Sequence, residues 1–283
     1  MRIVITGGKG MLGRTLQQVL QEHELVIADL PEWDITDAAG FDANLKNAKA
    51  DAVIHCAAMT AVDRCETEPD LAYKLNAIGS MNVASSCNRH GVRLIAISTD
   101  YVFDGGLDRP YHEFDIAGGA HTVYGMSKFA GEEMIRCHCP NHVICRLAWL
   151  YGPGGPSFVH TMLNLADGTR PTLKVVADQH GNPTSTFAAA RQLAVFLAHP
   201  ELVGTFHCTC EGESTWADFA SEIFRLAGKS QTIQPCTTAE FPRPAPRPLN
   251  SRLEKRMLRL SSLSPMPDWH DALAEFMIFE FRG

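Results

Sequence analysis

The chain has 283 residues, enough for one large domain or two smaller ones, and its composition of 45% apolar and 20% charged residues argues against disorder. The formal net charge of −7 argues against a broad nucleic-acid surface, which needs clustered Lys and Arg. No apolar run approaches the roughly 20 residues that a membrane span needs. "MRIVITGG" leads directly into a strand and a glycine turn, so we expect no signal peptide and a cytoplasmic protein.

The nine cysteines fit reduced thiols better than disulfides. Two close groups, "CHCPNH" and "HCTC", have C-x-C spacing, whereas zinc sites usually use C-x-x-C. We therefore expect buried thiols and no metal site.

Short runs rich in Val and Ile alternate with stretches of helical spacing in the first half of the chain. The predicted buried strands cover residues 2–6, 24–28, 51–58, 92–99 and 142–151. The predicted helices between them cover residues 11–22, 69–91 and 121–132. Asp70, after Pro69, should begin or cap the second of these helices, and Gly91 should end it. This alternation predicts an α/β fold with a doubly wound parallel sheet.

The pattern changes after Tyr151. Residues 172–185 read as a strand, a turn and a helix start, and residues 214–228 as an amphipathic helix with Ser214 as its N-cap. The proline-dense residues 241–252 exclude a helix interior, and residues 267–281 predict a terminal helix. We predict a dinucleotide-binding (Rossmann) domain over residues 1–150. A smaller C-terminal α/β substrate-binding domain would cover residues 151–283, with some segments returning to the first sheet.

A glycine-rich turn follows the first predicted strand. "VITGGKGMLGRTL" satisfies G-x-G-x-x-G at Gly8, Gly10 and Gly13, and G-x-x-G-x-x-G at Gly7, Gly10 and Gly13. A tight turn without a ligand also uses glycines, but these lie between a strand and a helix. Glycines at that place let the backbone approach a pyrophosphate held at the helix N-terminus. The motif therefore predicts dinucleotide binding.

An acidic residue ends the second predicted strand. Asp29 lies 16 residues after Gly13, close to the offset expected for a group that binds the adenosine ribose. A carboxylate there repels a 2′-phosphate, and no Arg follows at once, which favours NADH over NADPH while leaving both open. Asp34 and Ile35 follow where an adenine could rest.

Two further motifs place reactive side chains near this site. "HTVYGMSKFAGE" sets Tyr124 and Lys128 four residues apart, on one face of a helix. That spacing is common on helix surfaces and proves little alone. The fourth strand ends in "STDYVFDG", which brings Ser98, Thr99 and Asp100 to the sheet edge where ligands bind.

Together these motifs resemble the extended short-chain dehydrogenase/reductase superfamily, and within it the dTDP-4-dehydrorhamnose reductases. The matching stretches run in family order as far as Leu253: "CAAMTAVDRCETEP", "LNAIG", "STDYVFDG", "VYGMSKFAGE", "RLAWLYGPGG", "VVADQHGNPTS", "STWADFA" and "RPLNSRL". The resemblance implies an NADPH- or NADH-dependent oxidoreductase of nucleotide-sugar biosynthesis. It would reduce the 4-keto group of dTDP-4-dehydro-L-rhamnose to give dTDP-L-rhamnose.

The resemblance also implies roles for individual residues. Tyr124 would protonate the keto oxygen, Lys128 would bind the nicotinamide ribose and lower the tyrosine pKa, and Thr99 would polarise the carbonyl. The cofactor would be bound by Tyr124, Lys128, Gly7, Gly10, Met11, Leu12, Ala57, Ala58 and Thr60, together with Asp29, Asp34 and Ile35. The substrate would be bound by Thr99, Asp100, Val62, Tyr101, Phe103, Trp149, Arg247 and Asn250, with Arg252 a further candidate. The apolar members could equally be core residues, and the arginines could belong to a surface loop.

Three departures from the family pattern stand out. Met59 replaces a more usual aromatic residue or histidine in the cofactor-contacting loop, and Leu147 and Ala148 replace hydroxyl-bearing residues before Trp149. Either change could alter sugar selectivity. Some relatives form a metal-bridged dimer through a glutamate at the position of Thr15, so we expect a monomer or homodimer without that metal.

Other functions remain open from the sequence. A sister 4-ketosugar reductase would have a different product or nucleotide carrier. A non-catalytic NADP-binding regulatory subunit, like that of methionine adenosyltransferase, would not need the intact set of Thr99, Tyr124 and Lys128. Epimerases and dehydratases share the fold, but dehydratases usually bring a Glu after the acidic residue at position 100, and none follows Asp100.

Overall fold

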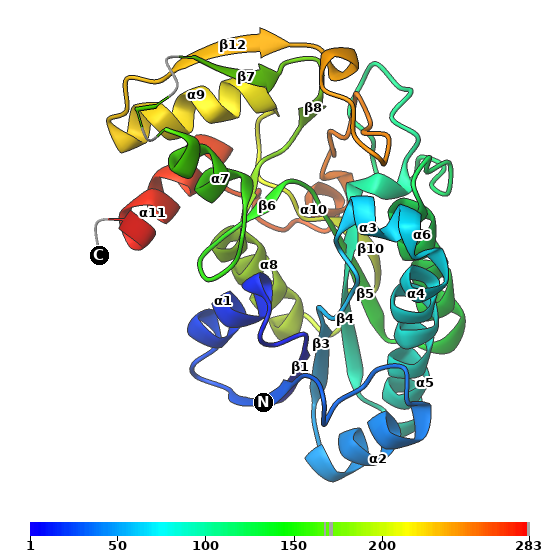
Figure 1. Ribbon diagram of the computed structural model, residues 1–283. Helices are drawn as coiled ribbons and strands as arrows, with labels where there is room; N and C mark the ends of the chain where they lie inside the picture. Colours follow the sequence, from blue (N-terminus) through cyan, green and yellow to red (C-terminus); the bar gives the residue numbers. More distant parts are fainter. Residues whose placement is uncertain (167, 170–171, 282–283) are drawn as a thin grey trace.

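A parallel sheet lies at the centre of the molecule (Figure 1). The computed structural model describes residues 1–166, 168–169 and 172–281. Within them, the sheet has six strands in the order β10–β5–β4–β3–β1–β2, and all its pairs are parallel. The strands are β1 (Arg2–Thr6), β2 (Glu24–Ala28), β3 (Ala52–His55), β4 (Arg93–Thr99), β5 (His142–Leu147) and β10 (Gly204–His207). This confirms the predicted doubly wound α/β fold.

Helices cover both faces of the sheet. On one face lie α1 (Met11–Val19) and α8 (Thr186–Ala198), which pack against each other; on the other lie α2 (Ala38–Ala48), α5 (Ser80–His90) and α6 (Val123–His138) (Figure 1). Successive side chains of a strand point to opposite faces. In β1, accordingly, Ile3 and Ile5 belong to one core cluster and Val4 to the other. The continuously apolar runs therefore reflect burial on both faces.

Between β3 and β4 the chain forms α3 (Val62–Thr67), α4 (Pro69–Tyr73), a π-helical turn η1 (Lys74–Gly79) and α5. Pro69 is the first residue of α4, with Asp70 beside it in the first turn, and Gly91 ends α5 in the left-handed conformation at φ 67°, as predicted. The helix predicted over residues 69–91 thus has a further helix, α3, before it. The π-helical turn in its middle was not expected from the sequence. Such turns occur often at functional sites.

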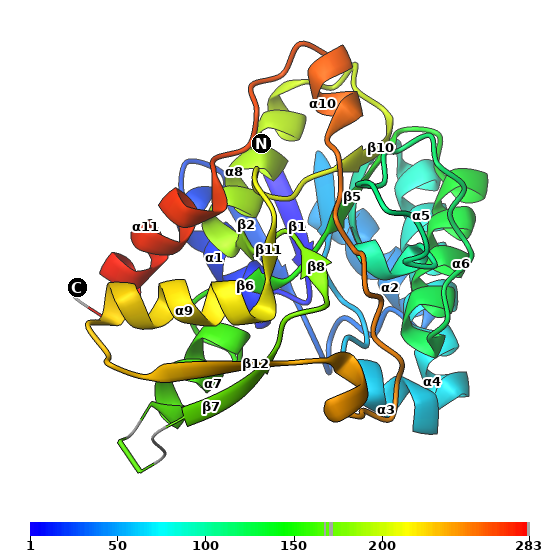
Figure 2. The ribbon, with the colours of Figure 1, turned by 90° about the horizontal axis from the view of Figure 1, so that it is seen from above.

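The C-terminal half adds a second layer beside the sheet (Figure 2). Helix α9 (Trp216–Ala227) packs on α7 (Phe158–Leu165) and on the parallel pair β7 (Thr172–Val176) and β12 (Thr232–Cys236). The smaller elements are η2 (Asp100–Val102), β6 (Leu150–Tyr151), β8 (His180–Gly181), β9 (Thr184–Ser185), β11 (Ser214–Thr215), η3 (Thr238–Glu240), α10 (Arg256–Leu260) and the terminal helix α11 (Trp269–Phe281). Strand β10 joins the large sheet beside β5. The division at residue 150 stays a prediction.

Two local predictions were wrong. The predicted strand 142–151 is two strands, β5 and β6, which belong to different sheets because Trp149 between them adopts φ 46° and turns the chain. The N-cap of α9 is Thr215, whose hydroxyl accepts a hydrogen bond from the Asp218 amide at 3.1 Å, and not Ser214. The central-sheet strand of this segment therefore ends at Leu147 and not at residue 151, and the cap of α9 lies one residue later than predicted.

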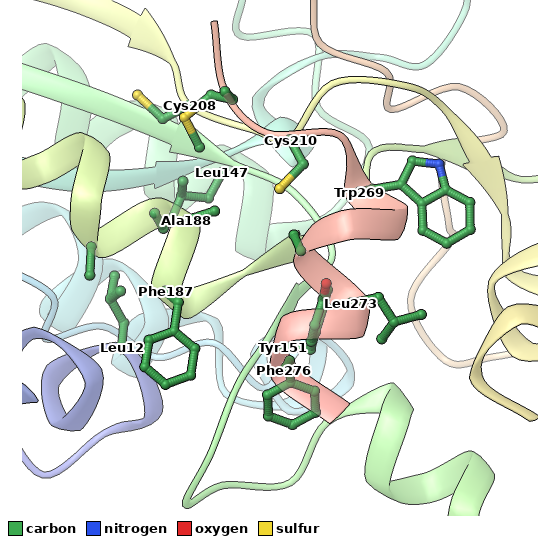
Figure 3. Packing of buried hydrophobic residues seen from close by; sticks show 14 of the residues in the cluster. Leu12, Leu147, Tyr151, Phe187, Ala188, Cys208, Cys210, Trp269, Leu273 and Phe276 are labelled. Carbon is green, nitrogen blue, oxygen red and sulfur yellow. The ribbon is translucent and has the colours of Figure 1, made fainter. Parts of the chain in front are cut away.

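One continuous core joins the large sheet to the C-terminal layer (Figure 3). Tyr151 lies beside Phe276 of α11, with ring centroids 5.4 Å apart, and Leu12 and Leu147 contribute from the sheet side. Leu147 and Ala148 are both buried. Because Leu147 belongs to this core, its departure from the family pattern changes how the core packs.

Candidate active site

The glycine turn after β1 sits against the end of β3. Gly7 adopts φ 65°, and a Cβ on it would lie 2.8 Å from the backbone nitrogen of Ala57, so the residue must be glycine. The Gly10 amide donates to the Gly7 carbonyl at 3.0 Å and closes the turn in front of α1. Because the chain leaves β1 for one side of the sheet and β3 for the other, this is the topological switch point at which such sheets bind ligands.

A cavity of about 500 Å³ opens at this turn. Its lining includes all ten cofactor residues predicted outside α6: Gly7, Gly10, Met11, Leu12, Asp29, Asp34, Ile35, Ala57, Ala58 and Thr60. The tight approach of backbone to backbone and the N-terminus of α1 suit a dinucleotide pyrophosphate. The residues present therefore fit a nicotinamide dinucleotide.

Lys9 is a cavity residue that the sequence reasoning missed, although it stands inside the glycine motif. The Asp29 carboxylate accepts hydrogen bonds from the Lys9 amide at 2.8 Å and the Leu30 amide at 3.0 Å, and the Lys9 ammonium donates to the Leu30 carbonyl at 3.2 Å. A cation thus stands beside the carboxylate at this end of the cavity. The charge argument for NADH over NADPH did not take this cation into account.

The loop that lines the cavity after β3 is clamped by Asn76 in η1. The Asn76 side chain accepts from the Met59 amide at 2.8 Å and donates to the Met59 carbonyl at 3.1 Å. It also donates to the Ser127 hydroxyl on α6 at 3.0 Å. Asn76 is buried. The clamp therefore fixes the cofactor loop and the Tyr124–Lys128 helix relative to each other.

Thr99 and Tyr124 lie close together, and Lys128 contacts Ile97, a residue of this cavity's lining. Thr122 caps α6, its hydroxyl accepting from the Gly125 amide at 3.0 Å, so Tyr124 and Lys128 lie in the first turns of the helix. The Thr99 hydroxyl lies near the Tyr124 phenol and donates to the buried Asp100 carboxylate at 2.8 Å. The Lys128 ammonium donates to the Ile97 carbonyl at 2.7 Å. All three side chains are buried.

The electrostatics of Tyr124 differ from the expectation. Burial raises the pKa of the phenol, the Thr99 hydroxyl lowers it, and the Asp100 charge raises it; Lys128 is not among the groups that shift it. The physical reason is that the ammonium faces the Ile97 carbonyl. Burial also lowers the pKa of Lys128 to about 8 and raises that of Asp100 to about 6. In this structure the phenol is held protonated.

Replacing Gly125 with alanine should lower kcat by about 100-fold while the protein stays folded. A Cβ at Gly125 would collide with the Tyr101 carbonyl oxygen, so the start of α6 would have to move. A displacement of about 1 Å at a catalytic group can cost about 10²-fold in rate. Steady-state kinetics measure this effect. Gly106→Ala is the control, because its nearest neighbour lies at 3.5 Å; equal rates in the two variants would contradict the prediction.

The predicted substrate residues mostly gather on the other side of Tyr124. Tyr101 meets the Tyr124 ring edge-on, with centroids 5.5 Å apart, and Val62 packs in the same apolar cluster with Met59. A cavity of about 260 Å³ is lined by Tyr101, Phe103 and Arg247. Most of the Phe103 ring is nevertheless core, since the residue is 3% exposed and stacks on Tyr111.

Arg247 also lines a second cavity, of about 430 Å³, which combines cations with aromatic rings. Its lining includes Lys174, Arg243, Phe158, Trp216 and Phe241. Asp63 of α3 pairs with the Arg247 guanidinium at 2.9 Å and accepts from the Ala245 amide at 3.1 Å. This contact holds the proline-dense segment 241–252 against α3. Asp63 was not predicted, although it stands in the quoted stretch "TAVDRC".

Trp149 lies flat on Trp216, with ring centroids 3.6 Å apart and planes within 5°. The Trp149 indole donates to the Ser251 hydroxyl at 3.2 Å, and that of Trp216 to the Gln179 side chain at 3.0 Å. Trp216 is thus a further site residue that the sequence did not reveal. Its only signal was its place in "STWADFA".

The structure does not support a substrate role for Asn250. Its amide group donates to the carbonyls of Leu107 at 2.7 Å and Arg109 at 2.8 Å, and its oxygen accepts from Arg252 at 2.8 Å. Arg252 is likewise paired with Glu213 at 2.8 Å. These side chains hold two loops together, so no polar atom of Asn250 is left for a ligand.

At the position of the family's metal-binding glutamate, the Thr15 hydroxyl donates to the Thr186 hydroxyl at 2.7 Å. Across residues 1–166, 168–169 and 172–281, no cluster of three or more His, Cys, Asp or Glu side chains is arranged to hold a metal ion. Over the same ranges, none of the helices has the length and apolar character required to cross a membrane.

Known proteins match this chain over nearly its whole length. Residues 1–280 match the family model of the RmlD substrate binding domain. A dTDP-4-dehydrorhamnose reductase of Streptomyces griseus is 40% identical, over 97% of this chain and 92% of the relative. A probable dTDP-4,6-dihydroxy-2-methyloxan-3-one 4-ketoreductase of Streptomyces antibioticus is also 40% identical, over 97% and 94%.

A solved structure gives the same picture in three dimensions. The dTDP-4-dehydrorhamnose reductase of Bacillus anthracis in complex with NADP superposes with a TM-score of 0.95 at 38% identity, over 98% of this chain and 99% of the other. The fold, the cavity at the switch point and the full-length matches lead to one assignment. The chain belongs to the RmlD substrate binding domain family, alongside the dTDP-4-dehydrorhamnose reductases.

Proposed function

We propose that the protein reduces the 4-keto group of dTDP-4-dehydro-L-rhamnose to give dTDP-L-rhamnose, with NADPH or NADH as reductant. The observation that carries this proposal is the position of Thr99, Tyr124 and Lys128. The Tyr124 ring meets Tyr101, which lines one of the two cavities beside Arg247. Lys128 donates to Ile97, which lines the dinucleotide cavity. Full-length relatives with the same reaction in their names support it.

The protein's own side chains would supply the proton that the reduction requires. The bound cofactor supplies the hydride. Tyr124 donates its phenolic proton to the sugar 4-keto oxygen, and its raised pKa means that the proton is present at neutral pH. The Thr99 hydroxyl, beside the phenol, can turn from Asp100 to the same keto oxygen and polarise it. Lys128 would hold the ribose next to the nicotinamide, and burial of all three groups excludes water from the step.

The nucleotide half of the substrate would occupy the larger of the two Arg247 cavities. Lys174, Arg243 and Arg247 supply positive charge for a diphosphate, and Phe158, Trp216 and Phe241 offer ring faces for a base. The Trp149–Trp216 stack would then separate the base from the sugar. A nucleotide sugar is thus the substrate class that these residues suit.

A coupled assay tests the proposal. The protein receives dTDP-4-dehydro-L-rhamnose, generated in situ, with NADPH and then with NADH, and cofactor oxidation is followed by absorbance. We expect oxidation that depends on the sugar and a dTDP-L-rhamnose product by chromatography. No oxidation of either cofactor would rule out the proposal and favour a non-catalytic cofactor-binding subunit.

A sister 4-ketosugar reductase is the second candidate, because the 40%-identical ketoreductase of Streptomyces antibioticus has a different sugar in its name. The same assay separates the two if the product is identified by NMR. Cofactor oxidation with another sugar, and none with dTDP-4-dehydro-L-rhamnose, would select the sister activity. A cytoplasmic location and a monomeric or homodimeric state stay predictions.

A further inference from the structure

A buried carboxylate stands one helical turn beyond Lys128. Glu132 is 2% exposed, and its side chain receives four hydrogen bonds. One oxygen accepts from the Ser98 hydroxyl at 2.6 Å and from Arg146 Nε at 2.9 Å; the other accepts from Arg146 at 2.7 Å and from Arg136 at 2.7 Å. Such a cluster is costly to bury unless every group is paired, and here the carboxylate is saturated.

The cluster connects the segments that carry the catalytic side chains. Tyr124, Lys128 and Glu132 follow one another at four-residue spacing along the same face of α6. Ser98 directly precedes Thr99 in β4, and Arg146 is its partner across the β4–β5 pair. Glu132 therefore connects α6, which carries Lys128, to β4, which ends in Thr99, and to β5.

We propose that Glu132 is a positioning residue for the reduction, and that its carboxylate keeps the buried ammonium of Lys128 charged for cofactor binding. The inference rests on the proposed function only in that Lys128 must bind the cofactor. It assigns a purpose to a buried ion cluster whose residues line neither the dinucleotide cavity nor the two cavities beside Arg247.

The groups that face Lys128 single out Glu132 as its counter-ion. From the end of β3 come the Cys56 thiol and the His55 imidazole, from β4 the Ile97 carbonyl, and from α6 itself Glu132. Burial raises the pKa of Cys56 to about 12 and lowers that of His55 to about 3, so both are neutral at physiological pH. The Tyr124 phenol is neutral as well.

Glu132 itself stays ionised. Burial raises its pKa, but the hydrogen bond and charge of Arg146, the charge of Arg136 and the Ser98 hydroxyl lower it further, to about 2. Burial lowers the pKa of Lys128 to about 8, and the Glu132 carboxylate opposes that shift. Without Glu132 the ammonium would therefore lose its proton at a lower pH. Arg136 and Arg146 thus keep Glu132 ionised, and the Glu132 carboxylate in turn favours the charged form of Lys128.

The test is the pH dependence of NADPH affinity in the full chain, measured by cofactor fluorescence between about pH 6 and pH 10. In the unmodified protein, affinity should fall as pH rises through the Lys128 pKa near 8, because the ammonium becomes neutral. In Glu132→Gln, the midpoint of this fall should move to lower pH by about one unit, the effect of removing one nearby opposite charge. Glu132→Asp keeps the charge and should restore the midpoint.

Two controls separate this role from a structural one. Glu133→Gln removes the neighbouring, half-exposed carboxylate that pairs with Arg136, and should leave the midpoint in place. If Glu132→Gln fails to fold because Arg146 loses its partner, the double variant Glu132→Gln with Arg146→Gln removes both charges. Its midpoint should shift in the same direction, since Arg146 is not among the groups that shift the Lys128 pKa.

An unchanged midpoint in the folded single or double variant would overturn the proposal, and so would a flat profile in the unmodified protein. A merely structural role would lower the melting temperature of Glu132→Gln and Glu132→Asp alike without moving the midpoint. If the midpoint shifts but dTDP-4-dehydro-L-rhamnose is not turned over, the proposed substrate fails and the role of Glu132 stands.

Discussion

Replacing Tyr124 with phenylalanine should leave NADPH binding intact and lower kcat by about 10²–10⁴-fold, the usual loss when a general acid is removed. The ring would keep its edge-on contact with Tyr101, so the pocket would hold its shape. Only the phenolic proton, held in place beside Thr99, would be missing. Cofactor fluorescence and steady-state rates with the sugar measure the two effects separately.

Tyr151→Phe is the matched control for this experiment. Tyr151 is buried in the shared core, and its hydroxyl has no hydrogen-bond partner among the described residues, so its removal should change neither rate nor affinity. If Tyr124→Phe kept the full rate, the acid would have to be another group. If both variants lost activity equally, packing and not proton donation would explain the loss.

Replacing Arg146 with methionine should lower the free energy of unfolding by about 3 kcal/mol, as measured by urea denaturation. Breaking a buried ion pair leaves the partner's charge uncompensated, at a typical cost of about 3–5 kcal/mol. The lower end applies because Arg136 still pairs with Glu132. The variant also loses the contact of the guanidinium with the Phe103 ring, 5.0 Å from its centroid.

Arg191→Met provides the comparison. Arg191 forms a bidentate pair with Glu275, but both side chains are about half exposed, so its removal should cost about 1 kcal/mol or less. A loss for Arg146→Met no larger than that for Arg191→Met would mean that the buried pair contributes nothing beyond a surface pair. The expected stabilisation of the fold by the buried Arg146–Glu132 pair would then be wrong.

The sequence predicted best where one local pattern decides the structure. β1 and β2 match their predicted bounds because each is centred on a continuous run of apolar residues; β1 is buried almost throughout, and the edge strand β2 is mostly half-buried. The ten cofactor residues share one cavity because the ends of parallel strands meet at one edge of the sheet. The turn at Trp149 was missed because no apolar pattern encodes a positive φ.

The site was less predictable where a side chain's role depends on a distant partner. Asn250 looked like a ligand-binding amide, but the carbonyls that saturate it belong to a loop far away in the sequence. Trp216 is recognised as a site residue only by its stacking on Trp149, and Asp63 only by its ion pair with Arg247. Likewise, the four-residue spacing of Tyr124 and Lys128 could not show that the ammonium donates to the Ile97 carbonyl.

The return of β10 and α8 to the first sheet limits how the molecule can be recombined. A chimera cut at residue 150 would not exchange a self-contained specificity module. It would also replace the edge strand beside β5 and the helix that packs on α1. Substrate preference should therefore be easier to alter by substituting side chains around Arg247 and Trp216 than by exchanging halves of the chain between relatives.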